Sequence, residues 1–159
     1  MFTLNRKELR GHTMKVAIAR KLALVVLLCM ASSAGAWAAD QAFRDGTGGM
    51  RLKDLQVGQG NGAVVGQVAT IHFVGWIDEK GVRGREIYNS RARGEPVSFV
   101  IGTDGVMQGW NEGVLGMKPG GKRMLLVPPG MAYGKRQVEN IPENTSLMFR
   151  IELIGLEEQ

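Results

Sequence analysis

The stretch that decides the fold reads Val106-Met107-Gln108-Gly109-Trp110-Asn111-Glu112-Gly113-Val114. Its apolar residues and glycines recur at helical spacing, and the sequence Lys118-Pro119-Gly120 beyond it is typical of a helix end. A helix of about two turns is not stable in isolation. We therefore expect it to pack against a β-sheet, where Trp110 would form the floor of an apolar pocket.

Short β-strands are predicted on both sides of this helix. Between residues 67 and 77, the apolar side chains of Ala69, Ile71 and Phe73 alternate with Thr70 and His72, which is the alternation of a strand. β-Branched and aromatic residues, which favour strands, are frequent in the same segment. Further strands are expected at residues 52–57, 86–89, 97–101, 123–127 and 146–156. The predicted fold class is α+β, with a curled antiparallel β-sheet wrapped over one short α-helix.

The N-terminal segment has the three-part layout of a secretory signal peptide. A basic start precedes an apolar run at residues 22–30, and the segment ends at Ala36-Trp37-Ala38. The apolar run is shorter than the roughly 20 residues that span a bilayer, and an uncleaved membrane anchor is the alternative interpretation. We expect a signal peptide at residues 1–38, with Met14 as an alternative start, and export of the protein, most simply to the periplasm.

The rest of the chain is divided into an arm and a single domain. Residues 39–50 are polar and rich in glycine, which predicts a flexible arm. Residues 51–159 are expected to form the domain. The one cysteine, Cys29, precedes residue 39, so we expect neither disulfides nor thiol chemistry in the domain.

The positive charge of the chain comes from its N-terminal segment. The formal net charge is +5, from 20 basic and 15 acidic residues. Six basic residues and one acidic residue precede residue 39, so the remainder carries 14 of each sign and is neutral. A neutral domain does not have the net basic face that nucleic-acid binding needs, and we expect no nucleic-acid partner. The local cluster of Arg83, Arg85, Arg91 and Arg93 is interpreted as a solvated loop, with a site for an acidic partner as the alternative.

Several motifs follow one another along the domain. They are Ile71-His72-Phe73-Val74-Gly75, the stretch from Val106 to Val114, Met117-Lys118-Pro119-Gly120-Gly121, Ala132-Tyr133-Gly134, Ile141-Pro142 and Leu147-Met148-Phe149-Arg150-Ile151-Glu152-Leu153. In this order and at this spacing, over residues 51–156, they resemble the motifs of the FKBP-type peptidyl-prolyl cis-trans isomerases, of the exported bacterial type. The resemblance implies an FKBP-like fold and peptidyl-prolyl isomerase activity.

The resemblance also implies a role for each residue of a proline-binding pocket. Trp110 would form its floor, the backbone N–H of Met107 would donate to a ligand carbonyl, and the hydroxyl of Tyr133 would bond the substrate carbonyl. These three residues are expected to carry catalysis. The residues expected to bind the substrate are Phe73, Ile87, Tyr88, Val97, Val106, Ile141 and Phe149.

Besides Phe73, which stands where the family usually has Tyr, three positions of this pocket depart from the family pattern. The family's Phe-Asp-Ser-Ser-Arg run is here Ile87-Tyr88-Asn89-Ser90-Arg91, so that Ile87 replaces a pocket Phe and Tyr88 replaces an Asp that polarises the site. Val97 also replaces an aromatic residue. Two interpretations of Tyr88 are left open, either a replacement donor within the site or a surface residue that is turned away.

The expected chemistry needs no nucleophile, because an enzyme of this kind binds the twisted Xaa-Pro amide more tightly than the planar one. We accordingly expect no metal and no cofactor. The predicted function is assistance to the folding of exported proteins, with proline-containing polypeptides as substrates and macrolide inhibitors as a further ligand class. The alternative is a proline-binding, chaperone-like module of the same fold with weak or no isomerase activity.

Overall fold

The computed structural model describes residues 42–158. They form one antiparallel sheet of seven strands in the order β1-β2-β6-β7-β3-β4, with β5 paired to β3. The strands are β1 (Arg44–Asp45), β2 (Arg51–Gln56), β3 (Val68–Glu79), β4 (Val82–Asn89), β5 (Val97–Val100), β6 (Lys122–Val127) and β7 (Leu147–Glu157). The helices are α2 (Ser90–Arg93), α3 (Gln108–Val114) and the 3-10 turns η1 (Thr47–Gly49) and η2 (Pro129–Met131).

The predicted signal peptide at residues 1–38 lies outside the described residues. Within the described part of the chain, the helices are too short or too polar to cross a membrane.

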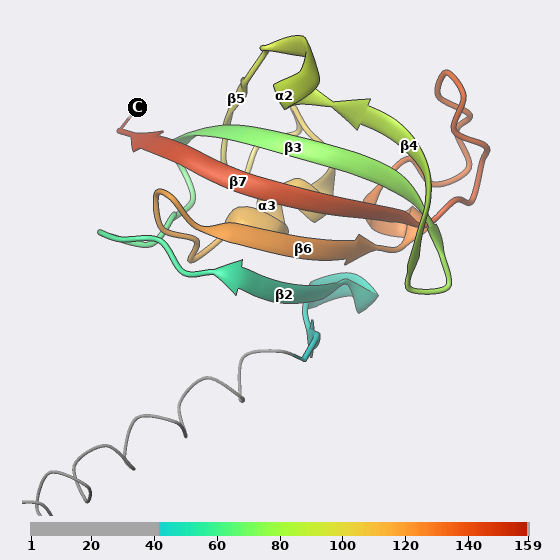
Figure 1. Cartoon of the computed structure of the whole chain (residues 1–159), viewed down its shortest axis with the longest axis horizontal. Coiled ribbons are helices and arrows are strands. Elements are labelled where there is room, and N and C mark those ends of the chain that lie inside the picture. The colour runs from blue at the N-terminus through green and yellow to red at the C-terminus, as the bar shows by residue number, and fades with distance from the viewer. Residues whose placement is uncertain (1–41, 159) are drawn as a thin grey trace, which may run out of the picture. The chain divides into compact units, whose positions relative to one another are not determined.

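The sheet curves around α3, which lies behind β6 and β7 in Figure 1. Two glycines bring this helix close to β6. A Cβ atom at Gly109 would lie 2.5 Å from Cγ1 of Val127, and one at Gly113 would lie 2.3 Å from Cδ1 of Leu125. Since real Cβ atoms do not approach so closely, glycine at both positions is what lets the helix rest on the sheet. The predicted α+β fold, with one short helix under a curled sheet, is confirmed.

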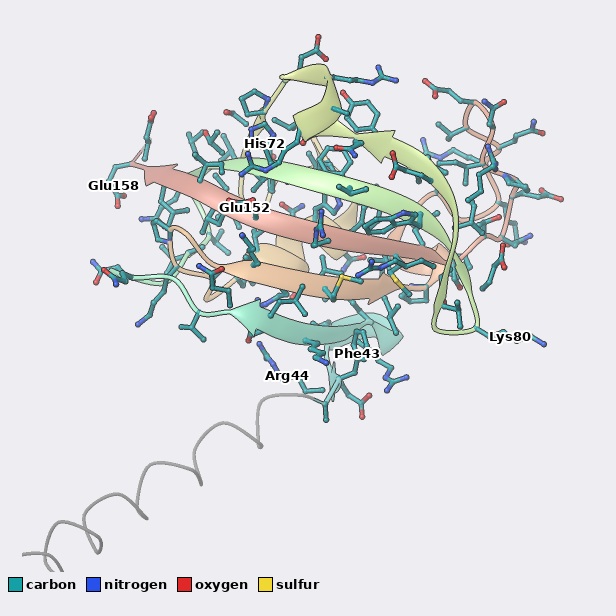
Figure 2. All side chains as sticks on the ribbon, viewed as in Figure 1. Phe43, Arg44, His72, Lys80, Glu152 and Glu158 are labelled. Atoms are coloured by element: carbon teal, nitrogen blue, oxygen red, sulfur yellow. The ribbon has the colours of Figure 1, made fainter. Side chains whose placement is uncertain are left out.

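Strand β3 is the centre of the sheet. Its residues 68–71 pair with β5, its residues 74–79 pair with β4, and its opposite edge pairs with β7. Strands β3 and β4 are joined by the two-residue turn Lys80-Gly81, whose φ angles are 58° and 88°. Two consecutive positive φ angles match the twist of the flanking strands in a tight hairpin. Figure 2 labels Lys80 at the tip of this hairpin.

The two faces of β3 and β7 differ in chemistry. The inner face carries buried Ile71, Phe73 and Phe149. On the outer face His72 and Glu152 are direct neighbours in the register, as their labels in Figure 2 show. The Nδ1 atom of His72 lies 2.9 Å from the hydroxyl of Ser90, so this histidine has a structural partner on the side of the sheet away from the core.

The flexible arm expected at residues 39–50 differs from the structure over residues 44–50. Arg44 and Asp45 pair with β2, and Arg44 forms an ion pair of 3.1 Å with Asp54. Met50 is buried in the core. The glycines of this segment predicted flexibility, but one buried apolar side chain and one ion pair are enough to hold it on the sheet.

Candidate active site

An apolar cavity of about 250 Å³ lies between α3, β3, β4, β7 and the loop that joins β6 to β7. Eight of the ten residues expected in the site line it, together with two that were not expected. The lining residues are Phe73, Ile87, Tyr88, Met107, Trp110, Tyr133, Val138, Glu139, Ile141 and Phe149. The fold therefore brings together residues that are up to 76 positions apart, from Phe73 to Phe149.

The two remaining expected residues, Val97 and Val106, do not line this cavity. Val97 pairs with Ile71 in the sheet and packs against the core. The small valine side chain is taken up by this packing and is not among the residues that line the cavity. Val106 instead lines an adjoining groove, which shares Met107, Trp110 and Tyr133 with the cavity.

The indole ring of Trp110 forms the floor of the cavity. Phe73 meets it edge to face with ring centroids 4.5 Å apart, and Phe149 does so at 5.7 Å. Phe99 lies 5.9 Å away and packs against the same ring. The Nε1 atom is buried without a hydrogen-bond partner among the described residues. The ring is thus held in place by apolar contacts alone, in an arrangement that aromatic pairs favour.

Gly75 of β3 makes room for the cavity wall. A Cβ atom at this position would lie 2.9 Å from Cε1 of Phe149 and 3.2 Å from Cγ1 of Ile87. A glycine inside a strand often marks such a close approach. The absence of a side chain here lets a β7 residue and a β4 residue meet over β3 at the cavity.

The loop between β6 and β7 folds over the cavity. Val138 and Ile141 form a small bridge, with N–H···O distances of 3.1 and 2.8 Å, and the N–H of Asn144 donates to the carbonyl of Gly134 at 2.7 Å. Glu139 occupies the tip with a φ of 48°. Arg85 of β4 donates to the carbonyl of Asn140 and ties the tip to the sheet.

Val138 and Glu139 are the lining residues that the sequence analysis missed. Both precede Ile141, which was expected in the site, and their nearness to it is the one signal that could have pointed to them. What turns them toward the cavity is the bridge and the positive φ of Glu139, neither of which is visible in the sequence.

The two donors that the resemblance assigns to substrate carbonyls have no hydrogen-bond partner among residues 42–158. The hydroxyl of Tyr133 is one of them, and the backbone N–H of Met107, the N-cap residue of α3, is the other. Burial raises the pKa of the Tyr133 hydroxyl, the charge of Glu139 raises it further, and the charge of Arg136 opposes them without reversing the shift. The hydroxyl therefore keeps its proton at neutral pH and can donate it in a hydrogen bond.

Buried Arg123 holds the C-terminal end of α3. Its Nη1 atom donates to the carbonyls of Gly113 at 2.8 Å and Leu115 at 3.0 Å, and its Nε atom donates to Asp54 at 2.5 Å. A cation at the C-terminus of a helix interacts favourably with the helix dipole. Trp110 lies on α3. The hydrogen bonds of Arg123, which link β2, β6 and α3, therefore also help to fix the position of Trp110 at the floor of the cavity.

The arginines that suggested a site for an acidic partner each have a partner within the domain. Arg83 lies 4.8 Å from the ring centroid of Trp76, and Arg93 lies 4.4 Å from that of Tyr88. Arg91 pairs with Glu152 at 2.7 Å, and Arg85 bonds the cavity loop as described above. These contacts favour the interpretation of the cluster as a solvated part of the fold.

Comparison with known proteins decides the family. The profile of the FKBP-type peptidyl-prolyl cis-trans isomerases matches residues 59–154, which is more than half of the chain. The chain belongs to this family. The resemblance of the chain to this family is thereby confirmed.

Individual relatives of this FKBP-type chain agree with the assignment. An FK506-binding protein of Neisseria meningitidis serogroup B is 38% identical over 112 residues, which cover 70% of this chain and 99% of that protein. The isomerase FkpA of Escherichia coli K12 is 34% identical over 120 residues, 76% of this chain but 42% of FkpA. The chain spans 26% of FK506-binding protein 3 of Yarrowia lipolytica, with 38% identity.

Solved structures of the family share the fold. The crystal structure of Escherichia coli FkpA has a TM-score of 0.66 at 28% identity, with 98% of this chain and 75% of that chain covered. The crystal structure of AtFKBP13 has a TM-score of 0.63 at 36% identity, with 72% of this chain and 98% of that chain covered.

Proposed function

We propose that the protein is an exported peptidyl-prolyl cis-trans isomerase that accelerates the folding of other exported proteins in the periplasm. The observation that carries this proposal is the cavity above Trp110, which combines aromatic walls with two free donors, the Tyr133 hydroxyl and the Met107 N–H. Membership of the FKBP-type family supports the reaction, and the signal-peptide pattern of residues 1–38 supports export.

The reaction to be accelerated is rotation about the Xaa-Pro peptide bond. Its barrier of about 18–20 kcal/mol arises because resonance gives the C–N bond partial double-bond character. In the twisted state the resonance is lost and the carbonyl becomes less polar. An apolar cavity favours that state relative to water, which hydrogen-bonds the planar amide well. Stronger binding of the twisted state than of the planar state is by itself catalysis.

Each group of the cavity contributes a separate part of this selectivity. The proline ring packs on the indole of Trp110, and burial of its apolar surface contributes about 25 cal/mol per Å² to affinity. The Tyr133 hydroxyl and the Met107 N–H hold carbonyls on the two sides of the ring, and each such bond contributes about 1 kcal/mol or more. Held at both carbonyls, the substrate is positioned while the bond between them turns.

Tyr88 is the observation that favours the second candidate function, a proline-binding module with little catalysis. It occupies the position where the family pattern has a polarising carboxylate, and its ring lines the cavity instead. Such a site would still bind proline. If the missing carboxylate limits the rate, Tyr88→Asp raises kcat/KM.

A protease-coupled isomerisation assay on a short Xaa-Pro peptide separates the two functions. We expect a clear rate above the uncatalysed one, and a loss of at least about tenfold in kcat/KM for Trp110→Leu, because the floor of the cavity is removed. Trp76→Leu is the matched control, since Trp76 lies on β3 and packs with Arg83 rather than at the cavity. A wild-type rate equal to the blank at micromolar protein would rule out the isomerase and leave the binding module.

Export is tested separately on the full chain. When the full chain is expressed in a bacterial host, we expect the protein in the periplasmic fraction. Mass spectrometry of the intact protein should show the loss of residues 1–38. Full-length protein in the membrane fraction would instead support the uncleaved anchor.

A further inference from the structure

Six methionines lie in the described part of the chain, and five of them are buried. The exposed fractions are 1% for Met50, 3% for Met117, 6% for Met124, 4% for Met131 and 3% for Met148. Met107 differs from these five because it is partly exposed. Among residues 42–158 it is therefore the methionine that a small solute reaches without opening the fold.

Met107 also lies close to Trp110, the floor of the cavity. It is the N-cap of α3, three residues before Trp110, and it is among the residues that line both the cavity and the adjoining groove. Both hollows share Met107, Trp110 and Tyr133. A chemical change of this side chain therefore alters the junction between them.

We propose that Met107 is an oxidation site at which peroxide-type oxidants reversibly switch off the proline cavity. The inference rests on the proposed function, because it regulates the same site. The thioether sulfur attacks one oxygen of hydrogen peroxide, a sulfur–oxygen bond forms, and the oxygen–oxygen bond breaks. The sulfur is oxidised by two electrons, and the second oxygen leaves as water after proton transfer. The product, methionine sulfoxide, is returned to methionine by methionine sulfoxide reductases.

The sulfoxide changes the cavity in two ways. Its oxygen is strongly polar and loses hydration when a proline ring closes over it beside Trp110, which weakens binding by about tenfold. It is also an acceptor that competes with the substrate carbonyl for the Tyr133 hydroxyl and for the Met107 N–H. Isoleucine and leucine have no sulfur and cannot undergo this oxidation, so the switch depends on methionine at position 107.

The order of oxidation is measured on the full chain with increasing hydrogen peroxide, by mass spectrometry of each methionine-containing peptide. We expect Met107 to gain one oxygen well before the five buried methionines, while the melting temperature stays unchanged. Oxidation of a buried methionine at the same or a lower peroxide concentration overturns the proposal.

The effect on function is measured as the ratio of kcat/KM after and before treatment. We expect this ratio to fall to about one tenth in step with the Met107 sulfoxide fraction, and to recover with a methionine sulfoxide reductase. The ratio should stay near one for Met107→Ile and Met107→Leu, whatever their starting activity. Met124→Leu is the control and should lose activity like the wild type, because Met124 does not line the cavity. An unchanged ratio in fully Met107-oxidised protein overturns the proposal.

The failure of this proposal can be told apart from that of the proposed function. If the untreated protein has no isomerase activity, the isomerase function fails, and the readout becomes the Kd of an Xaa-Pro peptide measured by calorimetry. A Kd that rises about tenfold on Met107 oxidation upholds the switch, and an equal Kd before and after oxidation overturns it.

Discussion

The rings of Phe73 and Tyr88 lie face to face, with centroids 5.0 Å apart and planes inclined by 9°. The guanidinium of Arg93 lies 4.4 Å from the centroid of the same Tyr88 ring. Of the two interpretations of Tyr88 that the sequence leaves open, the structure has the ring in the cavity wall. The Tyr88 ring stacks on Phe73, at a position where the family pattern has a carboxylate.

Removal of this wall should weaken substrate binding. Tyr88→Ala loses an aromatic pair that contributes about 0.5–1.5 kcal/mol beyond its buried area, so KM for an Xaa-Pro peptide should rise several-fold. Tyr88→Phe keeps the stack and removes only the hydroxyl, and its KM should stay close to that of the wild type. A loss of equal size in both variants would mean that the hydroxyl, and not the ring, is the functional part.

The Tyr133 hydroxyl should remain a hydrogen-bond donor up to alkaline pH. Tyr133→Phe is expected to lower kcat/KM by about tenfold, the effect of a hydrogen bond of roughly 1–1.5 kcal/mol. Because burial and Glu139 raise the pKa of this hydroxyl, the wild-type rate should fall only above the ordinary tyrosine range near pH 10.

The variant Glu139→Gln tests the electrostatic part of that shift. Loss of the negative charge lowers the pKa of Tyr133, so the alkaline fall in kcat/KM should move to lower pH. Glu143→Gln is the control, since it removes a carboxylate from the same loop without removing the one that acts on Tyr133. Identical pH profiles for Glu139→Gln and Glu143→Gln would exclude this role of Glu139.

The fold was predictable from the sequence where a local pattern of apolar and polar residues defines an element. The alternation of apolar and polar residues in β3 is long enough to define both faces of the strand, and it correctly placed Phe73 inside and His72 outside. The two-residue strand Arg44–Asp45 is too short for any period to show, and its pairing depends on Asp54, a partner distant in sequence. Tertiary contacts determine pairing of this kind. The glycine-rich composition of the segment does not predict it.

The site was predictable to the extent that motifs fix the positions of its residues. Trp110 and Tyr133 lie in motifs and line the cavity. Glu139 lies in a loop whose path depends on a positive φ angle, and Val97 was expected from a family position that an aromatic residue normally fills. Whether a side chain reaches the cavity depends on its length and on the backbone beneath it, and the motif does not specify these.

The contact between α3 and β6 should be intolerant of a single added methyl group. Gly113→Ala places a Cβ atom 2.3 Å from Cδ1 of Leu125, so the buried Leu125 side chain, the helix or the strand must shift. Overpacking of this kind costs about 1–3 kcal/mol of the free energy of unfolding, and any shift of α3 that relieves it moves Trp110. Urea unfolding and kcat/KM should therefore both decline. Gly155→Ala is the control, because no atom lies within 4 Å of the added Cβ, and it should change neither measurement.

The ion pair of Asp54 with Arg123 should make the free energy of unfolding of the domain depend on pH in the acid range. Burial raises the pKa of Asp54, but the hydrogen bonds and charges of Arg123 and Arg44 outweigh it and hold the pKa below its usual value. A carboxyl with a lowered pKa in the folded state stabilises the fold above its unfolded pKa of about 3.9, and that contribution is lost as the pH falls through the folded value. The free energy of unfolding should thus fall between about pH 5 and pH 2.

Two variants separate this pair from other acid effects. Arg123→Met removes the charge and the bonds to the carbonyls of Gly113 and Leu115, and should cost about 3–5 kcal/mol at neutral pH because the partly buried carboxylate loses its main partner. Asp54→Asn should be less stable than the wild type at pH 7 and should approach it at low pH, where the wild-type carboxyl is protonated. The exposed Asp104→Asn serves as the control for the loss of a surface carboxylate. Urea unfolding at a series of pH values measures all three, and a constant difference between Asp54→Asn and the wild type across the acid range would show that the pair does not titrate with folding.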